Sequence, residues 1–208
     1  MPESTSFRAS LFASSGRATP DRVGAGLAAA RDLGVLTGPV PLAVEGTGYL
    51  AGTDKQRRDG VCEAMRSSSD FAWAVRGGYG AGRLDPIDQK ILTSKPLVGF
   101  SDVCVLLAQT YAAGGQALHG PVVTSLADAD EGSCVAFVAA LNRLPRLWSL
   151  SRAEAHCAGP LIGGNIEVLS RMIGTEYEPS FRGKIVVLED VGEPMYRLDR
   201  ALNHLLVS

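Results

Sequence analysis

The chain lacks the features of several large classes of protein. Its 20 Lys and Arg residues do not outnumber its 22 Asp and Glu residues, and the formal net charge is −2. A nucleic-acid-binding protein would need a basic face, so we expect no nucleic-acid partner. The apolar runs are far too short to cross a bilayer, and residues 1–10 lack the apolar core of a secretion signal. We therefore expect no membrane partner.

The cysteines and histidines show no metal-binding pattern. The sequence has four cysteines and three histidines, which are Cys62, Cys104, Cys134, Cys157, His119, His156 and His204. None forms a C-x-x-C pair or a cluster with zinc spacing. We interpret all four cysteines as reduced and structural, which favours a cytoplasmic location, and we expect no metal ion and no cofactor.

A phosphate-binding loop is also absent. Two G-x-G-x-x-A matches occur, at 24–29 and 46–51. The first lies inside a helical pattern and the second precedes a separate capping box, so neither joins a strand directly to a helix. A dinucleotide or generic nucleotide binder is therefore the weakest interpretation.

Strands and helices alternate through the first part of the chain. The predicted strands are Phe7–Ala13, Pro39–Val44, Phe71–Val75, Leu97–Phe100 and Ala117–His119. The predicted helices are 20–33, 53–66, 102–113 and 134–144. This alternation is typical of an α/β layer with a mainly parallel sheet. We predict a flavodoxin-like parallel-sheet domain over residues 1–128 and a connection over 129–158.

Residues 159–208 form a second predicted α/β domain. It has one clear strand at 184–188, a helix at Ile166–Ile173 and an amphipathic helix at Tyr196–Val207. A single strand with two helices cannot close a core alone. We therefore expect this C-terminal domain to be incomplete in the chain.

One serine occupies an unusual place. The segment Lys95–Val103 (KPLVGFSDV) predicts a buried strand that breaks at Gly99 and leads into an apolar helix, with Ser101 at the break. There its hydroxyl would lie beside the free N–H groups of a helix start, which suits a nucleophile with an oxyanion transition state. The alternative is an ordinary helix N-cap, which Ser-Asp before an apolar run also predicts. The segment by itself favours the cap.

Two further segments follow predicted strands. Arg76–Gly80 (RGGYG) could bring backbone N–H groups close to a ligand, or could be a flexible turn. Glu189 ends a strand, where a carboxylate can orient a histidine base, or can simply be solvated. Neither alternative is excluded by the sequence.

Seven short segments together resemble the LD-carboxypeptidase family, serine peptidases of the S66 type. They are Gly48–Asp54, Arg76–Gly80, Val98–Asp102, Leu118–Pro121, Gly163–Asn165, Leu188–Asp190 and Tyr196–Arg200. The resemblance implies two domains that share a Ser-Glu-His triad, and it raises the nucleophile interpretation of Ser101 above the cap.

The resemblance also implies roles for individual residues. Ser101 would be the nucleophile and Glu189 the triad carboxylate, with the backbone N–H groups of Gly78 and Asp102 as the oxyanion hole. Arg76 is a hypothetical partner for a substrate carboxylate, because guanidinium binds carboxylates in a bidentate fork. Typical members are cytoplasmic homodimers that use no metal and no organic cofactor.

The implied reaction is cleavage of the L,D amide bond before the terminal D-alanine of murein tetrapeptides, for cell-wall recycling. The alternatives are amide hydrolysis of microcin C-type peptidyl nucleotides, or a peptide-binding homologue without activity. The family's histidine lies well downstream of the glutamate, whereas the only histidine after Glu189 here is His204, in a different motif. We therefore expect the triad histidine to be absent from this sequence, with His119 as the best substitute base.

Overall fold

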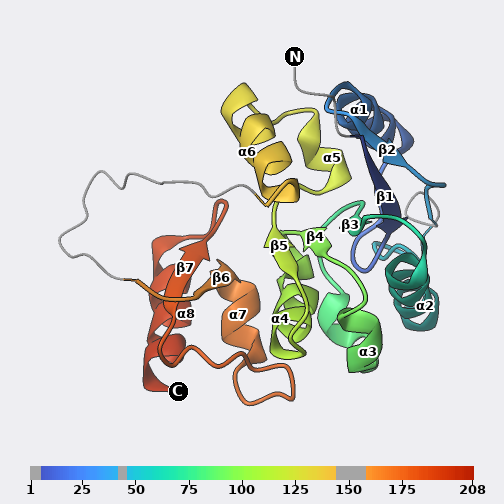
Figure 1. Cartoon of the computed structure of the whole chain (residues 1–208). Coiled ribbons are helices and arrows are strands. Elements are labelled where there is room, and N and C mark those ends of the chain that lie inside the picture. Colours follow the sequence, from blue (N-terminus) through green and yellow to red (C-terminus); the bar gives the residue numbers. More distant parts are fainter. Residues whose placement is uncertain (1–5, 42–45, 144–157) are drawn as a thin grey trace.

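The computed structural model describes residues 6–41, 46–143 and 158–208. Its elements, in chain order, are β1 (Phe7–Phe12), α1 (Pro20–Asp32), β2 (Val35–Thr37), α2 (Asp54–Arg66), β3 (Phe71–Ala74), η1 (Ala81–Arg83), α3 (Gln89–Leu92), β4 (Leu97–Gly99), η2 (Ser101–Val103), α4 (Cys104–Ala112), β5 (Ala117–His119), α5 (Val123–Leu126), α6 (Glu131–Leu141), β6 (Leu161–Asn165), α7 (Ile166–Met172), β7 (Ile185–Glu189) and α8 (Met195–Val207). The η elements are 3₁₀ helices. Figure 1 shows the α-helices and strands, coloured along the chain.

Five strands form one parallel sheet in the order β2-β1-β3-β4-β5. This is the flavodoxin-like order, so the predicted fold class is confirmed. The central strand β3 is buried along its whole length, as expected for a parallel sheet that is covered on both faces. In such sheets ligands bind beyond the carboxyl ends of the strands, beside the point where the strand order reverses. Here that point lies between β1 and β3.

Alternate residues of the strands pack into separate cores on the two faces. Ala72 and Ala74 of β3 pack into the core formed with α2, α3 and α4. Phe71 and Trp73 pack into the other core, with α1, α5 and α6. The period-2 alternation of a strand therefore supplies both layers of the sandwich.

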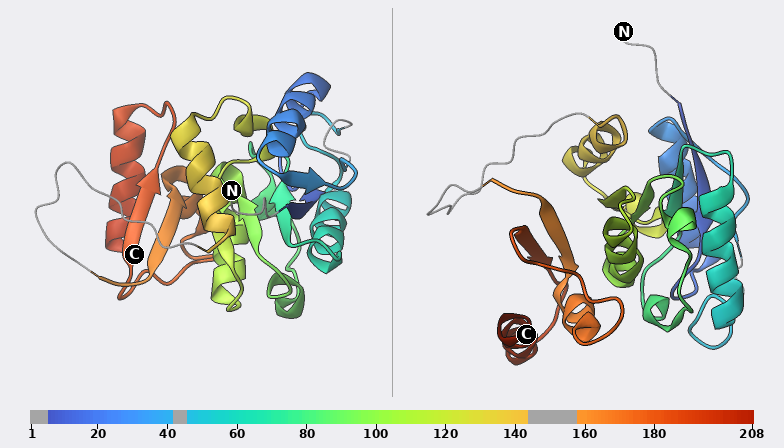
Figure 2. Two further views of the ribbon diagram at one scale, coloured as in Figure 1. Left: turned by 45° about the horizontal axis from the view of Figure 1, so that its top comes forward. Right: turned by 60° about the horizontal axis from the view of Figure 1, so that its bottom comes forward.

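The second sheet has two parallel strands, β6 and β7, with α7 and α8 beside it. Figure 2 shows this unit to one side of the larger sheet, where α7 and β6 contact α4. The sequence predicted β7 but missed β6, because Gly163 and Gly164 are poor strand formers. Gly163 is required there, since an added Cβ would lie 1.8 Å from the carbonyl oxygen of Val187.

The predicted second strand, Pro39–Val44, was wrong over the residues that can be compared. The strand β2 is Val35–Thr37, directly after the helix-ending Gly34, while residues 38–41 are not in a strand. Pro39 and Pro41 have no N–H to donate to a ladder, which explains the earlier end. Residues 42–44 of that prediction lie outside the described residues, as do His156 and Cys157.

The first glycine motif has a packing role. An added Cβ on Gly26 would lie 1.9 Å from the carbonyl oxygen of Val123, so the glycine allows α1 to approach α5 closely. The neighbouring Gly24 is open, with nothing within 4 Å. Both glycines lie inside α1, and neither starts it after a strand.

A search of the helices over 6–41, 46–143 and 158–208 finds none with the length and hydropathy to traverse a lipid bilayer. The domain boundaries at 1–128, 129–158 and 159–208 stay predictions.

Candidate active site

Ser101 lies at a strained turn between β4 and α4. Its φ is 62°, in the left-handed region that costs a non-glycine residue about 1–3 kcal/mol. The strand ends at Gly99, and the 3₁₀ turn η2 begins at Ser101 itself, after Phe100. No side chain caps the start of η2 or of α4 in this described segment, so Ser101 does not act as the N-cap. The turn places Ser101 at the carboxyl edge of the sheet, directly after β4.

The glycine loop after β3 lies directly against Ser101. An added Cβ on Gly77 would lie 2.9 Å from Cβ of Ser101 and 3.1 Å from its Oγ. Gly78 has a φ of 114°, which favours glycine. The carboxylate of Asp102 accepts a hydrogen bond of 2.8 Å from the N–H of Ala81, which ties the far end of the loop to the start of η2. The loop and the serine turn therefore form one unit.

Within the described residues, the two predicted oxyanion-hole N–H groups, those of Gly78 and Asp102, make no backbone hydrogen bond. The loop is fixed from the other side, where Gly16 donates its N–H to the carbonyl oxygen of Gly77 at 3.1 Å. This leaves free donors beside the Ser101 hydroxyl, as an oxyanion hole requires.

A buried arginine, Arg57, holds the glycine loop by hydrogen bonds to its backbone. The side chain of Arg57 is fully buried and donates to the carbonyl oxygens of Ser14 and of Gly80, the latter at 2.8 Å. It also pairs with Asp54 at 2.5 Å. The hydrogen bonds from Arg83 and then Arg57 hold the pKa of the Asp54 carboxyl below its usual value. A buried charge with these partners joins the loop after β1 to the loop after β3.

Glu189 ends β7 and faces His119, which ends β5. Their closest atoms, Nε2 of His119 and Oε1 of Glu189, are 3.8 Å apart, beyond hydrogen-bond length. Burial raises the pKa of Glu189, with a smaller contribution from the charge of Asp190. Burial also lowers the pKa of His119. Burial therefore disfavours charge on both groups.

His119 is also close to the serine turn. It pairs in register with Gly99 on β4, two residues before Ser101. Its ring packs edge-on against Phe100 with centroids 6.2 Å apart. His119 therefore lies close to Glu189 on β7 and beside the strand that leads to Ser101.

The sequence interpretation missed Cys104 and Asn165. Cys104, three residues after Ser101, has its Sγ within 4.8 Å of the ligand atoms of both His119 and Glu189. It accepts a hydrogen bond of 3.4 Å from the N–H of Asn165, and burial raises the pKa of its thiol to about 12. Asn165 pairs in register with Glu189. No signal in the sequence links these residues, because the contact joins α4 to the second sheet.

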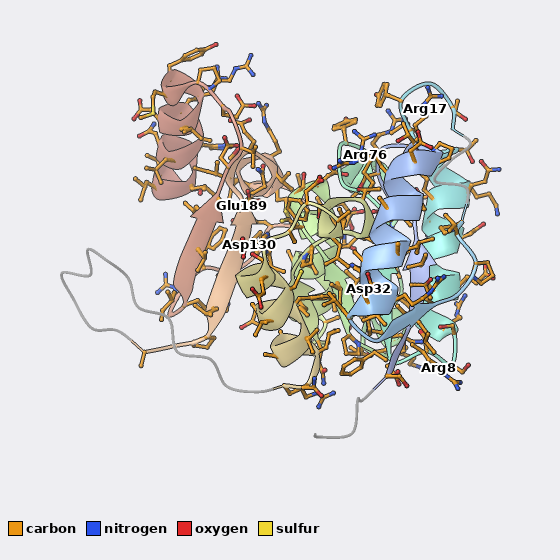
Figure 3. The ribbon with its side chains drawn as sticks, turned by 90° about the horizontal axis from the view of Figure 1, so that it is seen from above. Arg8, Arg17, Asp32, Arg76, Asp130 and Glu189 are labelled. Carbon is orange, nitrogen blue, oxygen red and sulfur yellow. The ribbon has the colours of Figure 1, made fainter. Side chains whose placement is uncertain are left out.

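No described side-chain contact links Arg76 or His204 to Cys104, His119 or Glu189. The guanidinium of exposed Arg76 donates to the carbonyl oxygen of Arg17. In Figure 3 these two arginines lie together on the side of the larger sheet, while Glu189 comes from β7. His204 is exposed on α8. The substrate role of Arg76 stays a prediction.

The sequence matches two family models. Residues 10–120 match the LD-carboxypeptidase N-terminal domain, and residues 158–208 match the LD-carboxypeptidase C-terminal domain. The first match covers the serine turn and the second covers Glu189. The chain belongs to the LD-carboxypeptidase family.

Relatives and solved structures agree with this assignment. The chain is 40% identical to a murein tetrapeptide carboxypeptidase of Pseudomonas aeruginosa, over 77% of this chain and 58% of that protein. It is 30% identical to a probable murein peptide carboxypeptidase of Bacillus subtilis, over 76% of this chain and 54% of that protein. The chain therefore spans somewhat more than half the length of these relatives.

Two solved structures share the fold. A muramoyltetrapeptide carboxypeptidase from Oxalobacter formigenes has a TM-score of 0.86 at 25% identity, over 96% of this chain and 71% of that one. An MccF-like protein from Bacillus anthracis has a TM-score of 0.84 at 20% identity, over 98% of this chain and 74% of that one. The second likeness is one of fold alone.

Proposed function

We propose that this chain carries the nucleophile and the triad carboxylate of a serine LD-carboxypeptidase. The reaction is cleavage of the amide before the terminal D-alanine of murein tetrapeptides. The observation that carries the proposal is the strained Ser101 turn packed against a glycine loop with free N–H donors. The names of the relatives from Pseudomonas and Bacillus support the substrate class. A cytoplasmic location and a homodimer remain expectations from the resemblance.

The geometry suggests how acyl transfer proceeds. The Oγ of Ser101 attacks the amide carbonyl while a base takes its proton, and the N–H groups of Gly78 and Asp102 stabilise the oxyanion. As the intermediate collapses, the protonated base gives its proton to the leaving nitrogen and D-alanine departs; the base then takes a proton from water, which hydrolyses the acyl-enzyme and restores the serine hydroxyl. Glu189 stabilises the charge that develops on the base, as the carboxylate of a triad does.

The base in this proposal is a histidine. The resemblance implies one further along the chain than Glu189. His119 is the alternative base, because its ring nitrogen lies 3.8 Å from Glu189 and its strand neighbours the serine turn. A His119→Asn variant separates the two. If His119 is the base, kcat falls by at least about 10⁴-fold, whereas another base leaves kcat within tenfold.

The test of the proposed function is a substrate panel. A murein tetrapeptide that ends in D-alanine is compared with the same peptide ending in L-alanine, and free alanine is measured. The proposal predicts release from the D-terminal peptide and none from its diastereomer. Release from both peptides, or from neither, would contradict it.

A second candidate is hydrolysis of peptidyl nucleotides, and one observation favours it. Tyr49 and Tyr79 form an aromatic pair beside the glycine loop, with centroids 6.1 Å apart and exposed fractions of 63% and 56%. Exposed rings can stack on a nucleobase. Trp73 cannot, because it is fully buried and donates its indole N–H to the carbonyl oxygen of Pro121. Turnover of an aminoacyl sulfamoyl adenosine that falls in Tyr79→Ala would support this candidate.

A further inference from the structure

Three groups that bind metals converge beside the serine turn. They are the thiol of Cys104 at the start of α4, the imidazole of His119 at the end of β5 and the carboxylate of Glu189 at the end of β7. Their ligand atoms all lie within 4.8 Å of one another. Ligands of one tetrahedral zinc ion lie about 3.5 Å apart, given bond lengths of about 2.0–2.3 Å. The three ligand atoms must therefore come closer together when the ion binds.

An independent observation points to a ligand here. The Oε1 atom of Glu189 is buried, and no described group donates a hydrogen bond to it. The same atom faces Nε2 of His119 across 3.8 Å. A buried carboxylate oxygen without a donor costs free energy, which either the N–H of the proposed triad histidine or a cation in the gap would recover, so the two would compete for this oxygen.

The backbone around Sγ of Cys104 also supports a metal site here. Gly164 has a φ of 143°, and an added Cβ would lie 2.4 Å from Sγ of Cys104 and 3.6 Å from Cδ2 of His119. The N–H of Asn165 donates to the same sulfur atom at 3.4 Å. Hydrogen bonds of this kind orient metal ligands from outside the coordination shell. The second sheet thus leaves room for the thiol and directs an N–H at it.

We propose that Cys104, His119 and Glu189 bind one Zn²⁺ ion, and that the ion inhibits the peptidase. A thiolate, an imidazole and a carboxylate suit zinc and do not suit Mg²⁺ or Ca²⁺. On binding, the thiol of Cys104 loses its proton to solvent and a sulfur–zinc bond forms. A ring nitrogen of His119 and a carboxylate oxygen of Glu189 each donate a lone pair, and water takes the fourth position. The inhibitory part rests on the proposed function of Glu189.

Cobalt absorption tests the site without any need for activity. The full chain, stripped of metal, is titrated with Co²⁺ alone, and the thiolate-to-cobalt charge-transfer band is followed. We expect one equivalent to saturate the band in the wild-type protein and in Cys134→Ser, a cysteine on α6. We expect no band in Cys104→Ser. No band in the wild-type protein, or a full band in Cys104→Ser, would overturn the proposal.

Zinc competition with a chelating dye gives the second measurement. The half-exposed His119 can be replaced without loss of the core, so His119→Asn keeps the test valid if Cys104→Ser fails to fold. We expect at least about 100-fold weaker zinc binding in His119→Asn, since loss of an outer-shell partner already costs about 10–100-fold. Unchanged affinity would contradict the assignment.

The inhibitory part has its own readout. Zinc should suppress D-alanine release by the wild-type protein, and a chelator should restore it. Ser101→Ala should lose activity and keep the cobalt band. If the cobalt band is present but no peptide is cleaved, the metal site is supported and the proposed function is contradicted. If peptide is cleaved but no band appears, the proposed function is supported and the metal site is contradicted.

Discussion

The two sheets of this molecule differ in how they are buried. In the larger sheet every residue of β3 is buried, with helices on both faces. In the smaller sheet, Val186 and Val187 of β7 are 41% and 53% exposed. A strand with a full core on each side is held in one position, whereas a strand with open apolar residues depends on the few contacts it makes.

This difference matters for the candidate active site. Ser101 comes from the buried sheet, so its strained backbone is surrounded by packed residues that maintain it. Glu189 comes from the exposed sheet and reaches the serine turn through contacts with His119, while β6 contacts η2 and α4. The proposed nucleophile is therefore fixed by the packing of the larger sheet, and the proposed triad carboxylate is fixed by the contact between the two units.

The first and largest predicted effect compares two side-chain truncations, one in each sheet, by their cost in unfolding free energy. Trp73 is fully buried and stacks near Phe137 with centroids 5.4 Å apart, so Trp73→Ala should lower the free energy of unfolding by about 3–5 kcal/mol. Val187→Ala on the exposed strand should cost about 0.5 kcal/mol or less. Urea unfolding of both variants measures the two costs. Equal costs would contradict the difference between the sheets.

The second prediction concerns the contact between the glycine loop and Ser101, the proposed nucleophile. Gly77→Ala places a Cβ 2.9 Å from Cβ of Ser101, so the serine must shift. A misplacement of about 1 Å can cost about 100-fold in rate, and we expect kcat/KM to fall by about that much. Gly82→Ala is the matched control in the same segment, because its Cβ would come no closer than 3.9 Å to another atom. Equal activity of the two variants would show that the contact is unimportant.

The third and smallest effect is a pH dependence of stability. The folded-state pKa of Asp54 is lowered by Arg83 and Arg57, so its ion pairs stabilise the fold above the unfolded pKa of about 4. This contribution is lost as the pH falls through the folded-state pKa. Asp54→Asn should therefore lower Tm at pH 7, and the difference from wild type should shrink toward zero at low pH. A difference that stays constant from pH 7 to pH 3 would refute the role of these pairs.

A double-mutant cycle sharpens this third test. With Arg83→Gln already present, Asp54→Asn should lower Tm by less than it does in the wild-type background, because the strongest partner of the carboxylate is gone. Additive effects would mean that the Asp54–Arg83 pair, at 3.0 Å, contributes nothing to the fold.

Local sequence patterns could predict much of the fold. The capping box of Thr53 and Gln56 forms as expected at the start of α2. The strand Ala117–His119 matches the prediction residue for residue. The turn at Ser101 was also predicted, since Gly99 ends a short buried run before an apolar helix. These features depend on neighbours along the chain.

Features that depend on distant contacts could not be predicted. The glycines of β6 weaken its strand propensity, and only the close approach to Val187 explains Gly163. The group formed by Cys104, His119 and Glu189 joins three elements from two sheets. Spacing along the sequence carries no information on such a group, so Cys104 was interpreted only as a reduced, structural cysteine.

The central claim is that Ser101 is the nucleophile, and turnover of a murein tetrapeptide tests it most directly. The measurement is kcat/KM for D-alanine release by the wild-type protein, by Ser101→Ala and by Ser133→Ala, an exposed serine on α6. The account predicts a loss of at least about 10⁴-fold in Ser101→Ala and no change in Ser133→Ala. Release by Ser101→Ala at a rate near that of the wild-type protein would contradict it.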